Sequence, residues 1–451
     1  PLFFLMILRP PSSTLDRSSS ASDVYKRQLQ VSGFAGSSRS LFLAHAHRNR
    51  VGSTLVVVED MSTAEELFED MTSLINPEEV ALFPSWEVLP YDQVSPPGDL
   101  SGRRIGALYA LLKSQPIFVV ATVRAVMQRT IPPAILAAST LDVSEGTSIP
   151  LSELIARCNG LGYERADMIQ APGQYSVRGG IVDVYPHELE HPCRIEFFGD
   201  EVESIRLFDI YSQRSSKNIT ELTVLPNREI VDDPATRDDV VRRVRKTGEA
   251  LSIDTKELVS QIEDVGLIEG SERYLPFFHP FAATIMNYLP DDTLIIQCES
   301  EQLEREAEIF AGEYDVARAR RTVAGDLVPE SNDAIMRWSE FKEAAAYYGM
   351  VEMVRGSRMA ESWFNVGAEA SGVYHGAMDV LKSRLEEWRA QKARIVIVCD
   401  NDGQAERLQE ILGPDFRDIN MVVGLMHAGF IIPDVPLICL LYTSDAADER
   451  S

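Results

Sequence analysis

Apolar and polar residues alternate most regularly between residues 174 and 214, where the chain reads QYSVRGGIVDVYPHELEHPCRIEFFGDEVESIRLFDIYSQR. Turn-forming residues interrupt the alternation at Pro186, Pro192 and the pair Gly199 and Asp200. Short alternating runs between such turns are typical of paired strands with one buried face, and a Gly-Asp pair favours a tight hairpin turn. The pattern therefore predicts a small antiparallel sheet.

A second pattern occurs on both sides of this segment. Short, mostly apolar runs at 55–60, 117–121, 293–299 and 393–399 are each followed by a helical pattern. A buried strand followed by a helix is the repeating unit of a parallel α/β layer. The sequence thus predicts an α/β multidomain chain, and its 451 residues are enough for several cores.

Charge and cysteine usage narrow the possible partners. The formal net charge is −26, which repels a phosphate backbone and favours a protein partner with a basic surface. The five cysteines and seven histidines show no disulfide or metal-ligand spacing, so we expect no metal site and a cytoplasmic location. No apolar stretch is long enough to predict a membrane-spanning helix.

The amino-acid sequence of the alternating segment resembles that of known families. VRGGIVDVYP followed by CRIEFFGDEVESIRLFD resembles the second domain of two bacterial repair families, the excinuclease B subunit and the transcription-repair coupling factor. In both families this domain binds the excinuclease A subunit. The resemblance therefore implies that excinuclease A is the partner of this segment.

The segment GFAGSSRS at 33–40 partly matches a phosphate-binding loop, G-x-x-x-x-G-K-[ST]. Gly33 and Ser40 fit, Gly36 lies between them, Ser38 replaces the second glycine and Arg39 replaces the lysine. These residues alone favour a Gly/Ser turn before a helix. The resemblance implies a relic loop without ATP chemistry, as in the first domain of the coupling factor, whereas the excinuclease B subunit needs an intact loop.

The region FPSWEVLPYDQVSPPGDLSGRRIGALYAL at 83–111 also distinguishes the two families. It resembles the coupling-factor pattern, in which Trp86 and Tyr91 flank a proline-bounded loop. The excinuclease B subunit carries a longer, tyrosine-rich hairpin here that slides between DNA strands, and this chain has no such insertion. An ordinary loop with buried aromatic residues is the alternative interpretation.

Three arginines of the alternating segment are candidate binding residues: Arg178, Arg194 and Arg206. A two-residue turn at 199–200 predicts one shared face for Arg194, Glu196, Phe198, Glu201, Glu203 and Ile205. Arg194 would then lie diagonal to Glu203, close enough to form an ion pair. A possible bulge at 179–180 leaves the face of Arg178 open.

On residue type alone, these arginines are solvated surface charges of little energetic weight. The resemblance instead implies that Arg178 and Arg194 contact excinuclease A, with Phe197 or Phe198 as apolar support. Arginine is a frequent anchor at such interfaces.

Asp400, Asn401 and Asp402 follow the apolar run at 393–399. Acidic residues at the carboxyl end of a strand can hold magnesium. Because no phosphate loop precedes them, a turn with a helix N-cap is the favoured interpretation.

The resemblance extends over residues 29 to about 440 and implies a domain order. We expect a disordered or artefactual tail (1–28), the two halves of a degenerate helicase-like α/β domain (29–133 and 223–325), an inserted sheet domain that binds excinuclease A (134–222), a linker (326–335), a small α/β domain (336–440) and an artefactual tail (441–451).

In function, the resemblance implies transcription-coupled nucleotide excision repair. The full-length family releases stalled RNA polymerase with an ATP- and magnesium-dependent DNA translocase, whose motor domains would follow residue 440. This chain would be the recruitment module, without cofactor or ATPase activity of its own. The alternative is an excinuclease B-type helicase subunit.

Overall fold

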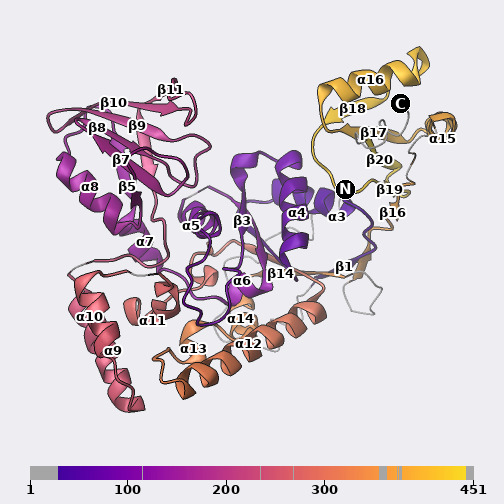
Figure 1. Ribbon diagram of the computed structural model, residues 1–451. Coiled ribbons are helices and arrows are strands. Elements are labelled where there is room, and N and C mark those ends of the chain that lie inside the picture. Colours follow the sequence, from indigo (N-terminus) through magenta and orange to yellow (C-terminus); the bar gives the residue numbers. More distant parts are fainter. Residues whose placement is uncertain are drawn as a thin grey trace.

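The computed structural model describes residues 29–113, 115–233, 235–267, 269–354, 363–372, 374 and 378–442 (Figure 1). Within these residues the chain is a mixed α/β structure with sheets of seven, six, five and two strands. The six- and five-stranded sheets lie on opposite sides of the seven-stranded sheet (Figure 1). The tail expected at 1–28, and residues 443–451 of the second tail, lie outside the described residues.

The seven-stranded sheet is parallel throughout, with the order β15-β1-β14-β13-β2-β4-β3. Three of its inner strands, β2, β4 and β13, are buried along their whole length, as their mostly apolar runs predict. The strands are β1 (Leu29–Ser32), β2 (Thr54–Val58), β3 (Val80–Phe83), β4 (Phe118–Thr122), β13 (Leu294–Cys298), β14 (Gly349–Val354) and β15 (Trp363–Asn365).

Helices cover both faces of this sheet, because successive strand residues point to opposite sides. Val56 and Val58 belong to the core beneath α3 and α4, whereas Leu55 and Val57 belong to the core beneath α5, α6, α12 and α14. These helices are α3 (Ser38–Arg48), α4 (Met61–Leu74), α5 (Gly98–Leu112), α6 (Val123–Met127), α7 (Pro133–Ser139), α12 (Ser300–Val323), α13 (Ser331–Ala334) and α14 (Trp338–Ala345).

The six-stranded sheet has the order β11-β10-β9-β8-β7-β6 and is antiparallel except between β6 and β7. Helix α8 (Leu151–Gly160) packs on its apolar face, and β5 (Leu141–Ser144) pairs with β12 (Glu221–Val224) where the chain enters and leaves. The sheet strands are β6 (Glu164–Arg165), β7 (Gln174–Arg178), β8 (Ile181–Val184), β9 (Cys193–Phe198), β10 (Glu201–Phe208) and β11 (Ser215–Ile219).

Both turns at the tips of this sheet contain two residues. Phe198 pairs with Glu201, which confirms the tight turn at Gly199 and Asp200. Arg178 pairs with Ile181, so Gly179 and Gly180 form a second hairpin turn and not a bulge. The parity of β7 therefore carries through to β8.

A helical cluster connects the six-stranded sheet to β13. Its core contains Val244, Ile262 and Phe278 and is shared with Trp86 from the loop after β3. The cluster consists of α9 (Arg237–Leu251), α10 (Lys256–Asp264), η2 (Ser271–Tyr274) and α11 (Leu275–Phe278).

The five-stranded sheet has the order β16-β19-β20-β17-β18, with α15 (Met378–Ala390) and α16 (Asp402–Leu412) on one face. Its strands are β16 (Glu369–Ala370), β17 (Arg394–Cys399), β18 (Asn420–Val423), β19 (Phe430–Ile432) and β20 (Leu437–Tyr442). Strand β20 includes residues 441 and 442, which pair with Val398 and Cys399. Those two residues therefore belong to the sheet and not to the expected tail.

The expected boundary before residue 336 does not separate the sheets. Strands β14 and β15 pair with β1 of the seven-stranded sheet, and α13 lies within the expected linker at 326–335. Glu352 interrupts the apolar pattern of β14, but Gln30 and Ser300 donate hydrogen bonds to its carboxylate. These partners, distant in sequence, compensate for a charged residue in β14, a strand that its local sequence does not predict.

Candidate functional site

The degenerate phosphate loop connects β1 to the start of α3. Gly33 and Gly36 have φ values of +76° and +52°, which glycine adopts without strain. Ser38 begins the helix, and its Oγ accepts a hydrogen bond of 3.0 Å from the Ala35 N–H. The Ser40 hydroxyl donates to Asp70 Oδ2 at 2.6 Å. The loop is therefore closed by its own hydroxyl groups and by a buried carboxylate of α4.

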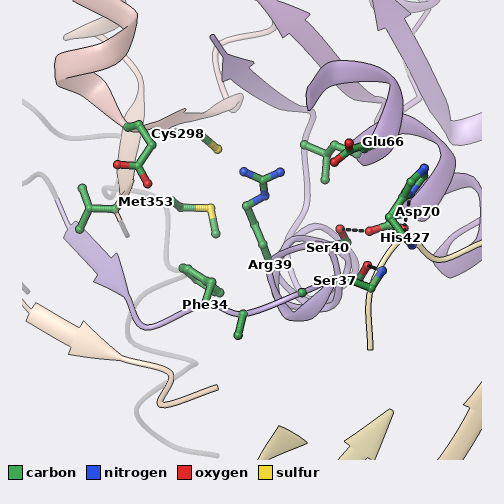
Figure 2. Close-up of a pocket in the computed structure, with 15 residues that line it drawn as sticks. Phe34, Ser37, Arg39, Ser40, Glu66, Asp70, Cys298, Met353 and His427 are labelled. Carbon is green, nitrogen blue, oxygen red and sulfur yellow. Dashed lines mark hydrogen bonds and ion pairs between the residues drawn. The ribbon is translucent and has the colours of Figure 1, made fainter. Parts of the chain in front are cut away.

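A cavity of about 250 Å³ lies beside this loop, and Figure 2 shows the Arg39 side chain extending into it. Glu66, Asp70 and Glu299 also line the cavity. A nucleotide phosphate site concentrates N–H donors and positive charge. This cavity instead combines one guanidinium group with three carboxylates.

Trp86 and Tyr91, the aromatic residues that flank the proline-bounded loop, are both buried. The Trp86 indole donates to Glu229 Oε1 at 2.6 Å, and the Tyr91 ring packs edge-on against Tyr314. Burial raises the pKa of the Tyr91 hydroxyl to about 12. These two rings fix the loop against the fold.

Asp183 of β8 holds two of the candidate arginines on the face of the six-stranded sheet opposite its core. Its carboxylate accepts hydrogen bonds from Arg194 Nε and Nη2 at 2.7 and 2.9 Å, and from Arg178 Nη2 at 2.7 Å. Asp183 is 2% exposed, whereas the Arg178 and Arg194 side chains are 48% and 16% exposed. The hydrogen bond to Asp183 raises the pKa of Arg194, so its charge is permanent.

The expected ion pair between Arg194 and Glu203 is wrong. The register of β9 and β10 shifts between Val202 and Ser204, so Arg206 and not Ile205 lies opposite Arg194. Such a bulge moves every later residue to the other face. Ile205 consequently lies in the core.

Arg206 lies on the same face as Arg194 and forms an ion pair with Glu196. The two adjacent phenylalanines separate because strand side chains alternate. Phe197 packs against the core of the sheet, whereas Phe198 is 79% exposed at the hairpin tip. The structure therefore brings Arg178, Arg194, Arg206 and Phe198 together on one face and places Phe197 on the other.

Sequence reasoning missed Asp183, although a signal was present. In IVDVYP the acidic residue alternates with the buried Val182 and Val184, which places it on the face opposite the core. The bulge had a signal too: the apolar positions of β10 change parity between Val202 and Ile205.

The acidic turn after β17 forms a helix cap. Asn401 Oδ1 accepts from the Gln404 N–H at 3.0 Å and is the N-cap of α16, while Asp400 Oδ2 accepts from the Gln404 side chain at 3.1 Å. The five cysteines, all within the described residues, are buried and form no disulfide bond. Across the described ranges, no group of three His, Cys, Asp or Glu side chains could hold a metal ion, and no helix is long and apolar enough to span a membrane.

Comparison with known proteins identifies relatives for most of the chain. The family described as the UvrB interaction domain matches residues 141–230, which include the arginine-bearing face. The chain is 27% identical over 412 residues to a transcription-repair-coupling factor of Bacillus subtilis, covering 86% of this chain and 34% of that protein. The corresponding protein of Haemophilus influenzae is 31% identical over 253 residues, covering 56% of this chain and 22% of its own length. That of Myxococcus xanthus is 28% identical over 415 residues, covering 86% and 34%. The chain thus spans about a third of the length of these relatives.

Proposed function

We infer that this chain, which is related to the N-terminal third of the transcription-repair-coupling factors and contains a UvrB interaction domain, recruits the excinuclease A subunit in transcription-coupled nucleotide excision repair. The face that carries Asp183, Arg178 and Arg194 is the binding surface. This is the recruitment module of a larger process, and it needs no cofactor of its own.

The Asp183 cluster is the observation that supports this proposal. One buried carboxylate holds two guanidinium groups, so the cluster keeps a net positive charge and its geometry is set before a partner arrives. Phe198 adds an exposed apolar contact next to it. The chain as a whole is acidic, but this face is locally positive, so the complementary patch on excinuclease A is acidic and partly apolar and not basic as the net charge alone predicts.

Replacing both arginines tests the proposal. We expect Arg178→Ala together with Arg194→Ala to weaken excinuclease A binding about thirtyfold or more, because a desolvated anchor contributes about 2 kcal/mol. Isothermal titration calorimetry with purified excinuclease A measures the affinity. Arg242→Ala is the matched control, since Arg242 is an exposed, ion-paired arginine on α9. Wild-type affinity of the double variant, with an unchanged circular dichroism spectrum, would sink the proposal.

We also propose that the seven-stranded sheet is a degenerate helicase-like domain into which the sheet domain is inserted. Its parallel order, the helices on both faces and the position of the loop at 33–40 after β1 support this assignment. Arg39 and Ser38 in place of the lysine and glycine, and the acidic cavity lining, argue against nucleotide binding.

An ATPase assay distinguishes this proposal from the alternative, an excinuclease B-type helicase subunit. We expect no hydrolysis with or without DNA, whereas DNA-stimulated turnover would favour the helicase. We propose that contacts with RNA polymerase and duplex DNA, and the ATP and magnesium of a motor, belong to the two thirds of the relatives that this chain does not match.

A further inference from the structure

The degenerate phosphate loop contacts a segment almost four hundred residues further along the chain. The Ser37 N–H donates to the Ala428 carbonyl oxygen at 3.0 Å, and the Ala428 N–H donates back to Ser37 Oγ at 3.1 Å. In a working phosphate loop, amides at the start of the helix bind the phosphate oxygens. Here the Ala428 carbonyl oxygen accepts the hydrogen bond of the Ser37 amide instead.

The second half of this contact is centred on Asp70, a buried residue of α4. Its Oδ1 accepts the His427 N–H at 3.0 Å and lies within 3.0 Å of His427 Nδ1, while Oδ2 accepts the Ser40 hydroxyl. Figure 2 shows Ser40, Asp70 and His427 side by side. The serine hydroxyl that would hold magnesium in a working loop is thus bonded to a carboxylate that also holds the distant segment.

Two further contacts extend the interface. Leu425 N–H donates to Ser73 Oγ at 2.8 Å, at the carboxyl end of α4. Leu41 of α3 packs against the apolar cluster of Phe430 and Ile432. The segment 425–429 is therefore held along its length by α3, α4 and the loop between β1 and α3.

Gly36 allows this close approach. A Cβ atom at Gly36 would lie 2.5 Å from the Gly429 carbonyl oxygen and 2.9 Å from that of Ala428, and its φ of +52° disfavours other residues. Gly36, which lies between the two glycine positions of the phosphate-loop pattern, here provides space for a peptide segment.

We propose that the loop at 33–40 is a docking site for the α/β unit formed by the five-stranded sheet with α15 and α16, and that segment 425–429 is the element it binds. In this site Ser37 hydrogen-bonds to the backbone of Ala428, and Asp70 accepts hydrogen bonds from His427. The Ser37 N–H cannot donate to the Ala428 carbonyl oxygen and to a nucleotide phosphate at the same time. Docking of segment 425–429 is therefore the role of this loop.

Native-state hydrogen exchange of the full chain tests the docking site. We expect Asp70→Ala to accelerate exchange of the His427 and Ala428 amides about tenfold or more, because a charge-assisted hydrogen bond is lost. The amides of β17 and β2 should keep their wild-type rates. Asp70→Asn is the matched control: its amide oxygen still accepts the His427 N–H, so it should preserve most of the protection. Unchanged rates at 427 and 428, or equal acceleration throughout 394–442, would overturn the proposal.

Disulfide trapping tests the same contact by its geometry. Ser37→Cys with Ala428→Cys should cross-link rapidly under mild oxidation, since the hydrogen bonds between Ser37 and Ala428 hold the two residues side by side and the native cysteines are buried. Ser37→Cys with Glu410→Cys, on the exposed side of α16, is the control pair. Cross-linking of both pairs at the same rate would contradict a docked segment.

Discussion

At the scale of single residues, the most deeply buried ion pair of the described residues is Arg104 with Glu229, which joins the chain segments before and after the six-stranded sheet. Arg104 of α5 donates to the Glu229 carboxylate through Nε and Nη2, and both side chains are almost inaccessible to solvent. Arg104 also lies over the rings of Phe83 and Trp86 and donates to the Pro84 carbonyl oxygen. Glu229 follows the six-stranded sheet in sequence, so this pair fixes the chain where it returns.

Breaking this pair from one side should be costly. We expect Glu229→Leu to lower the free energy of unfolding by about 3–5 kcal/mol, because it leaves the Arg104 charge buried without a counter-ion. Arg104→Met together with Glu229→Leu should cost less than the sum of the single changes. Urea unfolding followed by circular dichroism measures all three variants. A loss below about 1 kcal/mol for Glu229→Leu would show that water reaches the guanidinium group.

At the scale of elements, the sequence predicted the features that depend on neighbouring residues, namely strands and tight turns. The strands around residues 174–208 and the turn at Gly199 and Asp200 followed from alternation and turn residues. The partner of Arg194 did not, because a single bulged residue at 203 reverses the parity of β10. Asp70 also carried an unused signal: it is a carboxylate on the buried side of α4, beside Leu67 and Met71.

The cap of α16 gives a prediction at this scale. Asn401→Ala should destabilise the chain by about 1 kcal/mol, because the Gln404 amide loses its acceptor. Asn401→Asp should be nearly neutral, since aspartate caps equally well. Thermal unfolding of both variants, with and without millimolar magnesium, measures the change in stability. A magnesium-dependent rise in Tm that disappears in Asp400→Asn would instead indicate a metal site.

At the scale of the whole molecule, the sequence predicted the α/β class but not which strands share a sheet. Strand β14 joins β13 and β1 through Val351 and Met353, whose run is short and interrupted by a charge. The contact between Asp70 and His427 spans 357 residues and has no local signature. Such long-range pairings depend on the assembled fold and not on neighbouring residues.

Net charge gives the prediction for the whole molecule. With 69 acidic and 43 basic side chains, the chain should bind duplex DNA weakly or not at all at physiological salt. Fluorescence anisotropy with a labelled duplex, at low and at physiological salt, measures this. Sub-micromolar binding with a steep dependence on salt would reveal a basic groove.

The pairing of β5 with β12 also bears on how such a chain could arise. Leu141, at the entry, lies opposite Val224, at the exit, so the two ends of the insertion are separated by only about 5 Å, one strand spacing. A segment whose two ends lie close together can be inserted into a surface loop of a host domain, or removed from it, without disrupting the host's own sheet. The segment that matches the UvrB interaction domain is therefore suited to transfer between host proteins, in evolution or by design, at a surface loop whose ends are equally close.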